Sequence, residues 1–248
     1  MIQSQKAAEF RKRHQKGNPL VLYNIWDAGS AKAVADAGAL ALATGSAAVA
    51  AAQGFVDGEK TPLELACQII SRIVAATALP VTMDFEGGYA TTAGAITKNV
   101  AQMLQTGAIG LNFEDQIVGK GGLYTTETQG TRIAAVRAAS SDLFINSRTD
   151  LFLQEPDKTK HANLMDEAIS RAQIYHASGA DGFFVPGLVD TKLINVLCET
   201  LPMPVNIMKS PDAPTNTALA GLGVSRISYG PFPYFTAMAA LSEQAQTL

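Results

Sequence analysis

Eight short apolar runs alternate with longer segments of helical period along the chain, and this alternation is the strongest constraint on its fold. Repeated strand and helix units indicate a parallel sheet, because successive parallel strands need a crossover connection. An open doubly wound sheet is disfavoured, since it would need fewer strands and a glycine-rich phosphate turn after the first one. We therefore predict an α/β protein, a (β/α)8 TIM barrel, as a single domain over residues 1–248 with a short N-terminal helix.

The apolar runs and the periodic segments give approximate bounds for the predicted elements. The predicted strands are Leu20–Trp26, Ala39–Thr44, Pro80–Phe85, Ala108–Phe113, Leu143–Ser147, Gly182–Val185, Val205–Met208 and Ser225–Tyr229. The predicted helices are Gly29–Ala37, Pro62–Thr77, Thr92–Thr106, Thr128–Ala139, His161–Ser178, Thr191–Thr200, Thr215–Ala220 and Tyr234–Gln244. Two segments that follow strand ends, Ala47–Thr61 and Asp115–Glu127, are expected to be long loops, where binding residues are common.

Charge and hydropathy argue against several classes of function. The formal net charge is −3 and no basic stripe occurs, so nucleic acid is not expected as a partner. No apolar stretch is long enough for a membrane span, and Met1–Arg13 lacks the apolar region of a secretory signal, so we expect a cytoplasmic protein. The basic residues between Lys6 and Lys16 are interpreted as a solvated face of the N-terminal helix.

Acidic clusters follow three neighbouring predicted strands, at the end of the barrel where active sites are built. The clusters are Met83–Tyr89, Asn112–Gln116 and Asn146–Asp150. Alternation along an extended chain puts these pairs on one side of their strands: Asp84 with Glu86, Asn112 with Glu114, and Asn146 with Arg148. Taken singly, each acid is an ordinary exposed loop residue. Together they predict a site for Mg²⁺, which prefers oxygen ligands.

Arg148 is the expected partner of a substrate carboxylate, because a guanidinium group binds a carboxylate through two hydrogen bonds. The histidines His14, His161 and His176 fall outside the predicted strand ends, which argues against zinc and against a histidine base. We interpret His161 and His176 as surface or packing residues of one outer helix. A serine hydrolase is also disfavoured, since the chain has no Gly-x-Ser-x-Gly motif.

Seven stretches, in order over nearly the whole chain, are similar to motifs of the isocitrate lyase/phosphoenolpyruvate mutase superfamily. They are Asn24–Ala31, Thr44–Ala47, Gly54–Glu59, Asp84–Tyr89, Gly110–Gln116, Ser147–Asp150 and Gly179–Gly182. Members of this superfamily make or break a C–C or P–C bond next to an α-oxo acid, through an enolate or a related oxyanion. The resemblance implies a Mg²⁺-dependent enzyme of this type, in a phosphonomutase-like subgroup.

The resemblance also implies roles for single residues. The metal, Mg²⁺ or Mn²⁺, is expected to bind Asp84 directly and Glu86, Glu114 and Asp57 through water. The residues assigned to the substrate are Trp26, Thr44, Gly45, Ser46, Asn112 and Arg148, with backbone N–H groups contributing. The residues assigned to catalysis are Arg148, Lys120 and Asp57.

One departure from the superfamily bears on the reaction. Its lyases carry a gating-loop cysteine after the Glu-Asp pair, whereas Val118–Tyr124 contains neither cysteine nor histidine. Cleavage of isocitrate or methylisocitrate is therefore not expected. The candidate proton donors that remain are Lys120, which occupies the matching lysine position, Tyr124 and Tyr89.

We expect a Mg²⁺-dependent lyase or decarboxylase that breaks a C–C bond beside an α-oxo or 2-hydroxy carboxylate through a metal-stabilised enolate. A phosphonomutase or phosphonopyruvate hydrolase stays open, as does a barrel that binds an oxo acid without turnover. Members of the superfamily are usually tetramers that exchange a C-terminal helix. The chain ends soon after its predicted eighth helix, so an exchanged segment would be short or missing. We expect a homo-oligomer, dimer or tetramer, and the exchange of a helix stays open.

Overall fold

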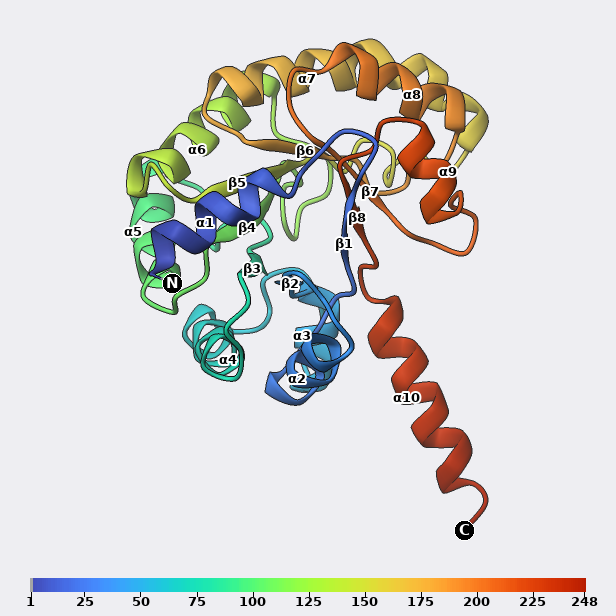
Figure 1. Ribbon diagram of the computed structural model, residues 1–248. Coiled ribbons are helices and arrows are strands. Elements are labelled where there is room, and N and C mark those ends of the chain that lie inside the picture. Colours follow the sequence, from blue (N-terminus) through green and yellow to red (C-terminus); the bar gives the residue numbers. More distant parts are fainter. Residues whose placement is uncertain (1) are drawn as a thin grey trace.

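The computed structural model describes residues 2–248, in which eight parallel strands form a nearly closed barrel with helices outside it (Figure 1). The strands are β1 (Leu20–Leu22), β2 (Leu42–Ala43), β3 (Val81–Asp84), β4 (Gly110–Glu114), β5 (Phe144–Arg148), β6 (Gly182–Phe184), β7 (Val205–Met208) and β8 (Arg226–Ser228). From β2 to β8 each strand pairs with its sequence neighbour, and β8 pairs with β1. Between β1 and β2 the described chain has only an isolated bridge from Ile25 to Thr44. The predicted barrel is confirmed.

Helices fill the crossovers between successive strands. They are α2 (Ala28–Asp36), α4 (Leu63–Ala75), α5 (Ala93–Leu104), α6 (Thr126–Ala139), α7 (Met165–Ala177), α8 (Thr191–Thr200) and α9 (Asn216–Gly221). The apolar face of α4 shows the packing, because Ile70 and Ile73 on that face are buried. Asp27, which follows the first predicted strand, caps α2 and accepts the Ser30 N–H at 2.7 Å. No helix within residues 2–248 is long and apolar enough to cross a membrane.

Two predicted segments differ from the structure. The predicted loop Ala47–Thr61 begins with helix α3 (Ser46–Ala52), most of whose residues are alanine, the best helix former. The predicted helix His161–Ser178 begins with a separate 3-10 turn, η1 (Lys158–Leu164), before α7 starts. His161 is buried in that turn and His176 lies on α7, so the two histidines do not share one helix as predicted.

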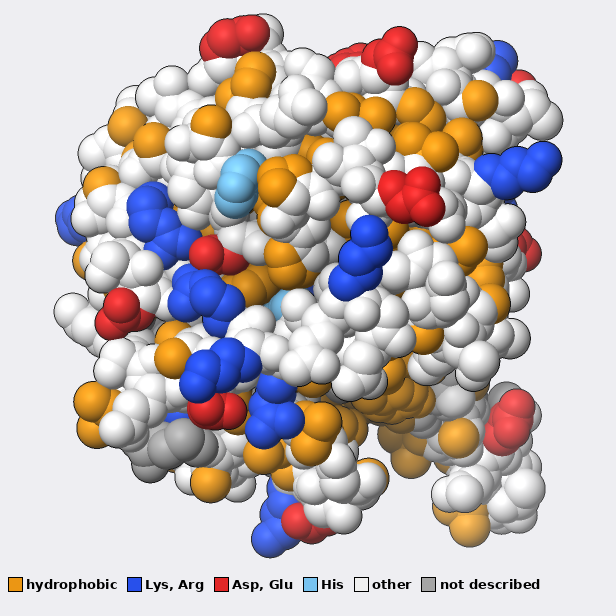
Figure 2. All heavy atoms as spheres, turned by 45° about the horizontal axis from the view of Figure 1, so that its top comes forward, with side chains coloured by type: hydrophobic (Ala, Val, Ile, Leu, Met, Phe, Trp, Pro, Cys, Tyr) orange, Lys and Arg blue, Asp and Glu red, His pale blue; other side chains and the backbone are white. Residues whose placement is uncertain are grey.

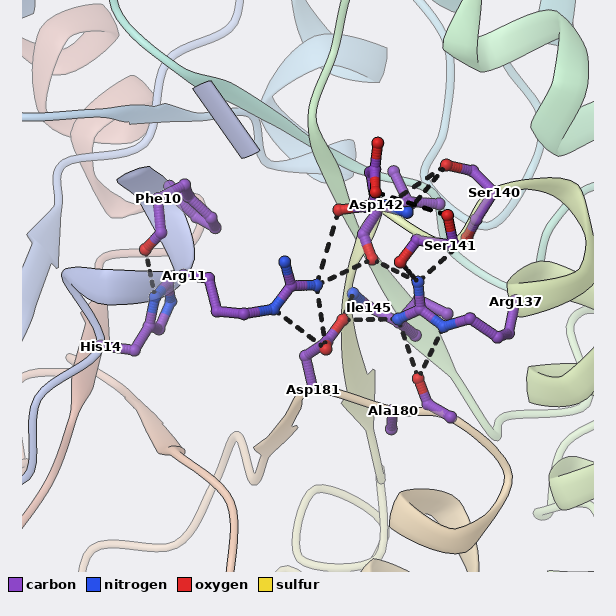
Figure 3. Close-up of polar contacts among 12 residues, drawn as sticks. Phe10, Arg11, His14, Arg137, Ser140, Ser141, Asp142, Ile145, Ala180 and Asp181 are labelled. Atoms are coloured by element: carbon purple, nitrogen blue, oxygen red, sulfur yellow. Dashed lines mark hydrogen bonds and ion pairs between the residues drawn. The ribbon is translucent and has the colours of Figure 1, made fainter. Parts of the chain in front are cut away.

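Helix α1 (Gln3–Lys12) closes the N-terminal end of the barrel. Its Phe10 is buried and meets Phe144 of β5 edge-on, with ring centroids 5.2 Å apart. Arg11 is not the solvated residue that was predicted, because its Nη2 lies 3.0 Å from Asp181 Oδ1 (Figure 3). Arg137 binds the other oxygen of the same carboxylate at 2.6 Å. This ion-paired cluster anchors α1 against the loops that precede β5 and β6.

Helix α10 (Phe232–Ala245) leaves the barrel instead of covering it as the eighth helix of the repeat (Figure 1). Its residues Phe235, Met238 and Leu241 are between 37% and 60% exposed. On the barrel, Val21 of β1 and the neighbouring Tyr23 are also exposed, by 39% and 44%. In Figure 2 the helix stands apart at the lower right, with hydrophobic side chains on the walls of the hollow between it and the barrel.

Candidate active site

A cavity of about 180 Å³ opens at the C-terminal ends of the strands, where the acidic clusters were expected. The residues that line it are Asn24, Gly45, Ser46, Ala47, Asp57, Asp84, Asn112, Arg148, Leu153, Phe184, Met208, Ser228, Gly230 and Pro231. A larger hollow of about 390 Å³ lies beside α1 at the opposite end, but Asp142 is the only ionisable residue among its described lining. The cavity at the strand ends therefore has the groups that chemistry needs, and it is the candidate site.

Asp84 is the last residue of β3 and lines the cavity, and only one of its two carboxylate oxygens accepts a hydrogen bond. Its Oδ2 accepts the backbone N–H of Ser46 at 3.1 Å, and its own N–H donates to Thr44 Oγ1 at 3.0 Å. The other oxygen, Oδ1, is buried and has no hydrogen-bond partner in the described chain. A buried carboxylate oxygen without a donor is costly, so this atom suits a bound cation.

Glu86 lies in a sharp turn after β3. The strand ends at Asp84, and the φ angles of Glu86, Gly88 and Tyr89 are 49°, 85° and 55°, all in the left-handed region. The strand parity predicted for Glu86 is therefore wrong. The turn still holds its carboxylate beside the site, because Oε2 accepts the Glu59 N–H at 2.6 Å and Oε1 accepts the Tyr89 hydroxyl at 3.2 Å.

Two carboxylates that line the cavity, Asp57 and Asp84, lie close enough to Glu86 and Glu114 for these four charges to repel one another. Burial, and then the charges of Asp57 and Asp84, raise the pKa of Glu86 to about 7. Burial also raises the pKa of Asp57, and the charge of Asp84 adds to it. Burial raises the pKa of Glu114 against the opposing charge of Arg148. No three Asp, Glu, His or Cys side chains in residues 2–248 converge as direct ligands of one ion. The set fits a hydrated Mg²⁺ with few direct protein ligands.

Arg148, at the end of β5, is fixed in the cavity wall by two acids. Its Nη1 lies 3.0 Å from Glu114 Oε2, while Nε and Nη2 bond both oxygens of Asp150 at 2.5 and 2.9 Å. The Asp150 N–H in turn donates to Asp115 Oδ1 at 3.0 Å. Burial alone lowers the pKa of Arg148, but Glu114 and Asp150 raise it well above its usual value. The guanidinium therefore stays charged and can still offer N–H groups to an anion in the cavity.

The other residues predicted for the substrate divide into two groups. Gly45, Ser46 and Asn112 line the cavity, and Thr44 lies beside it in a small hollow shared with Glu86. The backbone N–H of Ser46, predicted to cradle the oxo acid, is already bonded to Asp84. Trp26 packs edge-on against Tyr234, with ring centroids 5.2 Å apart, and is not among the described residues that line the cavity.

Two of the three predicted catalytic residues line the cavity, and the third does not. Asp57 and Arg148 both line the cavity. Lys120 is exposed on the loop between β4 and α6 and does not line the cavity in the described chain. Tyr89 donates its hydroxyl to Glu86, and Tyr124 lines a different hollow with Arg132.

Several cavity residues were missed by the sequence analysis. At the ends of β6, β7 and β8 the cavity meets Phe184, Met208 and Ser228, and not the nearby Pro186, Lys209 and Tyr229. The Lys209 ammonium instead donates to the carbonyls of Ala213 and Pro214, and Tyr229 packs against the Tyr23 ring. Alternation was applied to the sequence only for β3, β4 and β5. The same alternation along the later strands puts Phe184, Met208 and Ser228 on their inner faces.

Comparison with known proteins gives a consistent family. An uncharacterised protein of Mycobacterium tuberculosis is 32% identical over 96% of this chain and 88% of its own length. An oxaloacetate decarboxylase of Pseudomonas savastanoi pv. phaseolicola is 28% identical over 91% of this chain and 80% of its own. The crystal structure of a Burkholderia cenocepacia protein, provisionally assigned as a phosphonomutase, superposes with a TM-score of 0.96 at 46% identity and covers 99% of both chains.

The family model described as phosphoenolpyruvate phosphomutase matches residues 10–248, which is nearly the whole chain. The match includes every strand of the barrel and all the residues that line the cavity. The chain therefore belongs to the phosphoenolpyruvate phosphomutase family, within the isocitrate lyase/phosphoenolpyruvate mutase superfamily that its motifs resemble.

Proposed function

We propose that the chain is a Mg²⁺-dependent lyase or decarboxylase that breaks a C–C bond next to an α-oxo or 2-hydroxy carboxylate. The observation that carries this proposal is one cavity lined by both Asp84 and Arg148. Asp84 has a buried oxygen without a partner in the described chain, and Arg148 is a fixed cation. A metal beside a guanidinium suits a small anion such as oxaloacetate or oxalate. The similarity to an oxaloacetate decarboxylase supports the same class.

The proposed metal ligands are Asp84, directly, and Glu86, Glu114 and Asp57 through water. Bound Mg²⁺ supplies a Lewis acid that stabilises negative charge on the oxo oxygen. Arg148 holds a carboxylate of the substrate, and Asn112 offers its side-chain amide from the cavity floor. Gly45 lines the cavity without a side chain, which leaves its backbone open to the ligand.

In a decarboxylation the bond to the departing carboxylate breaks, its electron pair passes into the enolate, and CO₂ leaves. The enolate carbon then takes a proton. Tyr89 is a poor donor, because burial and the charge of Glu86 raise the pKa of its hydroxyl, which already donates to Glu86. Lys120 would have to move from its exposed loop to act. Asp57, which lines the cavity and whose pKa is raised by burial, is the proposed donor.

The decisive test is the variant Asp84→Asn, with the exposed Asp36→Asn as its matched control. We expect Asp84→Asn to lose Mg²⁺ binding in calorimetry and about 100-fold or more in kcat/KM for oxaloacetate, since it removes the direct ligand of the Lewis acid. Asp36→Asn should match the wild type in both measurements. Unchanged Mg²⁺ affinity and turnover in Asp84→Asn would contradict the proposed site.

A second candidate is a phosphonomutase or phosphonopyruvate hydrolase, which would use the same cation and break a P–C bond. The observation that favours it is the 46% identity to the Burkholderia protein. Phosphorus NMR after incubation with phosphonopyruvate separates the two, because a new phosphate or phosphate-ester signal appears only with the phosphonate chemistry. If Mg²⁺ and oxalate together raise the melting temperature but no oxo acid or phosphonate is turned over, the barrel is a binding protein.

We also propose that the chain forms a homo-oligomer, a dimer or tetramer. The support is an apolar face on α10 that its own barrel does not cover, together with the exposed Val21 and Tyr23 on the barrel. A second copy supplies both complementary surfaces at once. We therefore propose that α10 of each copy covers the β1 side of a neighbouring barrel, so that the copies exchange this helix.

A further inference from the structure

Arg226 is a buried cation in the centre of the barrel, directly below the candidate site. It is two residues before Ser228 on β8, so it faces inward with that cavity residue, and it is 0% exposed. No carboxylate of residues 2–248 lies within 4.0 Å of it. Its Nε and Nη1 have no hydrogen-bond partner in the described chain, and its Cζ lies over the Phe10 ring, 5.9 Å from the centroid.

An arginine that is buried without a carboxylate partner is not expected to stabilise the fold. An unpaired buried charge is strongly unfavourable, and an apolar side chain of similar volume would pack here without that penalty. Burial lowers the pKa of Arg226 to about 9, and only the charge of Asp84 acts in the other direction. The guanidinium is therefore still charged at neutral pH. Its retention in this place indicates a role in the site above it.

Two inward positions of the barrel strands accept no side chain. Gly110 and Gly182 stand at inward positions, two residues before Asn112 on β4 and Phe184 on β6. A Cβ at Gly110 would lie 2.9 Å from the Phe144 carbonyl oxygen, and one at Gly182 would lie 2.9 Å from Asn146 Oδ1. Side chains at these two positions would therefore collide with β5, so the interior of the barrel is closely filled at these positions.

The polar contact of Arg226 with the site passes through Asn112. Arg226 Nη2 donates to Asn112 Oδ1 at 3.2 Å, and Asn146 Nδ2 donates to the same oxygen at 2.9 Å. Asn112 lines the cavity, so its Nδ2 group is left to face the ligand. An asparagine pair alone could flip together and exchange donor for acceptor. Arginine can only donate, so its contact keeps the Oδ1 of Asn112 toward Arg226 and leaves Nδ2 toward the cavity.

We propose that Arg226 is a positioning residue that locks the Asn112 amide so that its NH₂ group donates into the cavity, toward an anionic oxygen of the substrate. The identity of that ligand rests on the function proposed above. Without Arg226, Asn112 can present its carbonyl oxygen instead, which repels a carboxylate. The arginine thus sets the preference of the cavity floor for an anion.

The test compares Arg226→Met, which keeps length and loses charge, with the wild type by calorimetry. Oxalate affinity in the presence of Mg²⁺ should fall roughly 10- to 100-fold, the value of one hydrogen bond to a charged group. The affinity for Mg²⁺ alone should rise severalfold, because a positive charge near Asp84 is removed. A merely structural role of Arg226 predicts that both affinities fall together, and that result overturns the inference.

A double-mutant cycle checks the route through Asn112. In an Asn112→Ala background, Arg226→Met should cause no further loss of oxalate affinity, since its effect is transmitted by that amide. Additive losses contradict the inference. If Arg226→Met does not fold, Asn112→Asp carries the test: it replaces the donor by an acceptor, and unchanged oxalate affinity in that variant contradicts the inference equally.

A measurement without ligand separates this inference from the proposed function. Wild-type protein that fails to bind oxalate contradicts the proposed function alone. The side-chain amide resonances of Asn112 in ¹⁵N-labelled protein then decide the role of Arg226. They should shift or split in Arg226→Met because the amide is free to rotate, whereas unchanged resonances overturn the inference.

Discussion

His14 lies at the closed end of the barrel, where its ring stacks on Phe144 at a centroid distance of 4.3 Å and Nδ1 contacts the Phe10 carbonyl oxygen at 2.8 Å. Burial, and then the charge of Arg226, lower its pKa from 6.5 to about 3. Between these two pH values the unfolded chain binds a proton that the folded chain does not. The protein should therefore lose stability as the pH falls from 6.5 toward 3, by up to about 5 kcal/mol from this group.

We predict that His14→Phe reduces this loss of stability at low pH. Urea unfolding of the variant and of the wild type at pH 8 and pH 4.5 measures the effect, and the pH 8 pair isolates the change in packing. The difference in unfolding free energy between the two pH values should be smaller in the variant. An identical difference in both proteins would mean that His14 takes up its proton freely in the fold.

Glu86 changes the stability of the fold with pH in the opposite direction to His14. Its pKa is raised from 4.5 to about 7 by burial and by Asp57 and Asp84, so the folded chain holds a proton that the unfolded chain has released. Stability from this group is therefore lost as the pH rises from 4.5 through 7. A divalent cation that binds the ionised cluster removes that repulsion and stabilises the fold by mass action.

We predict that saturating Mg²⁺ raises the melting temperature more at pH 8 than at pH 5, and that Glu86→Gln reduces this difference. The exposed Glu199→Gln is the control and should behave as the wild type. Thermal unfolding monitored by circular dichroism at the two pH values gives the comparison. An equal Mg²⁺ effect at both pH values in the wild type would argue that the cation binds elsewhere.

At the scale of elements, the turn after β3 determines where Glu86 lies. Gly88 in this turn has φ 85°, and a Cβ there would lie 2.8 Å from Phe113 Cε2. Gly88→Ala should therefore destabilise the protein by about 1–3 kcal/mol and weaken Mg²⁺ binding as the turn shifts. Gly94→Ala, in α5 with no atom within 4 Å of the new Cβ, is the control and should be neutral or stabilising by about 0.4–1 kcal/mol. Urea unfolding and Mg²⁺ calorimetry of both variants test this.

The same turn shows why sequence patterns reach only part of the site. Strands β4 and β5 stay extended to Glu114 and Arg148, so alternation places their pairs correctly. Strand β3 stops at Asp84, and the left-handed backbone of Glu86 itself then ends the alternation. Periodicity reports local geometry and cannot foresee such a turn. It predicts the barrel because eight apolar runs share one geometry.

Contacts between distant elements are beyond the reach of local patterns. The hydrogen bond from Arg226 to Asn112 joins β8 to β4, and Asp57 enters the cavity from the segment after α3. Arg11 reads as a solvated residue on a polar helix, yet it pairs with Asp181 when α1 closes the barrel. Each of these groups has an ordinary sequence context and acquires its role only from the closure of the barrel.

At the scale of the whole molecule, α10 is the element that the single barrel does not use. Phe235, Met238 and Leu241 recur every three residues, so they form one apolar stripe on a helix that projects from the fold (Figure 1). The barrel meanwhile exposes Val21 of β1, the strand next to β8, and the neighbouring Tyr23. Exposed apolar stripes of this kind mark protein interfaces.

We predict that the wild type is a dimer or tetramer at micromolar concentration and that Leu241→Glu shifts it toward the monomer, because a charge cannot be buried in the stripe without a partner. Ala240→Glu, on the opposite face of the same helix, adds the same charge away from the stripe and should keep the wild-type mass. Size-exclusion chromatography with light scattering measures all three proteins. A monomeric wild type would contradict the proposal. An oligomer that Leu241→Glu leaves intact would show that it assembles through another face, with α10 exposed to solvent in the assembly as it is in the single chain.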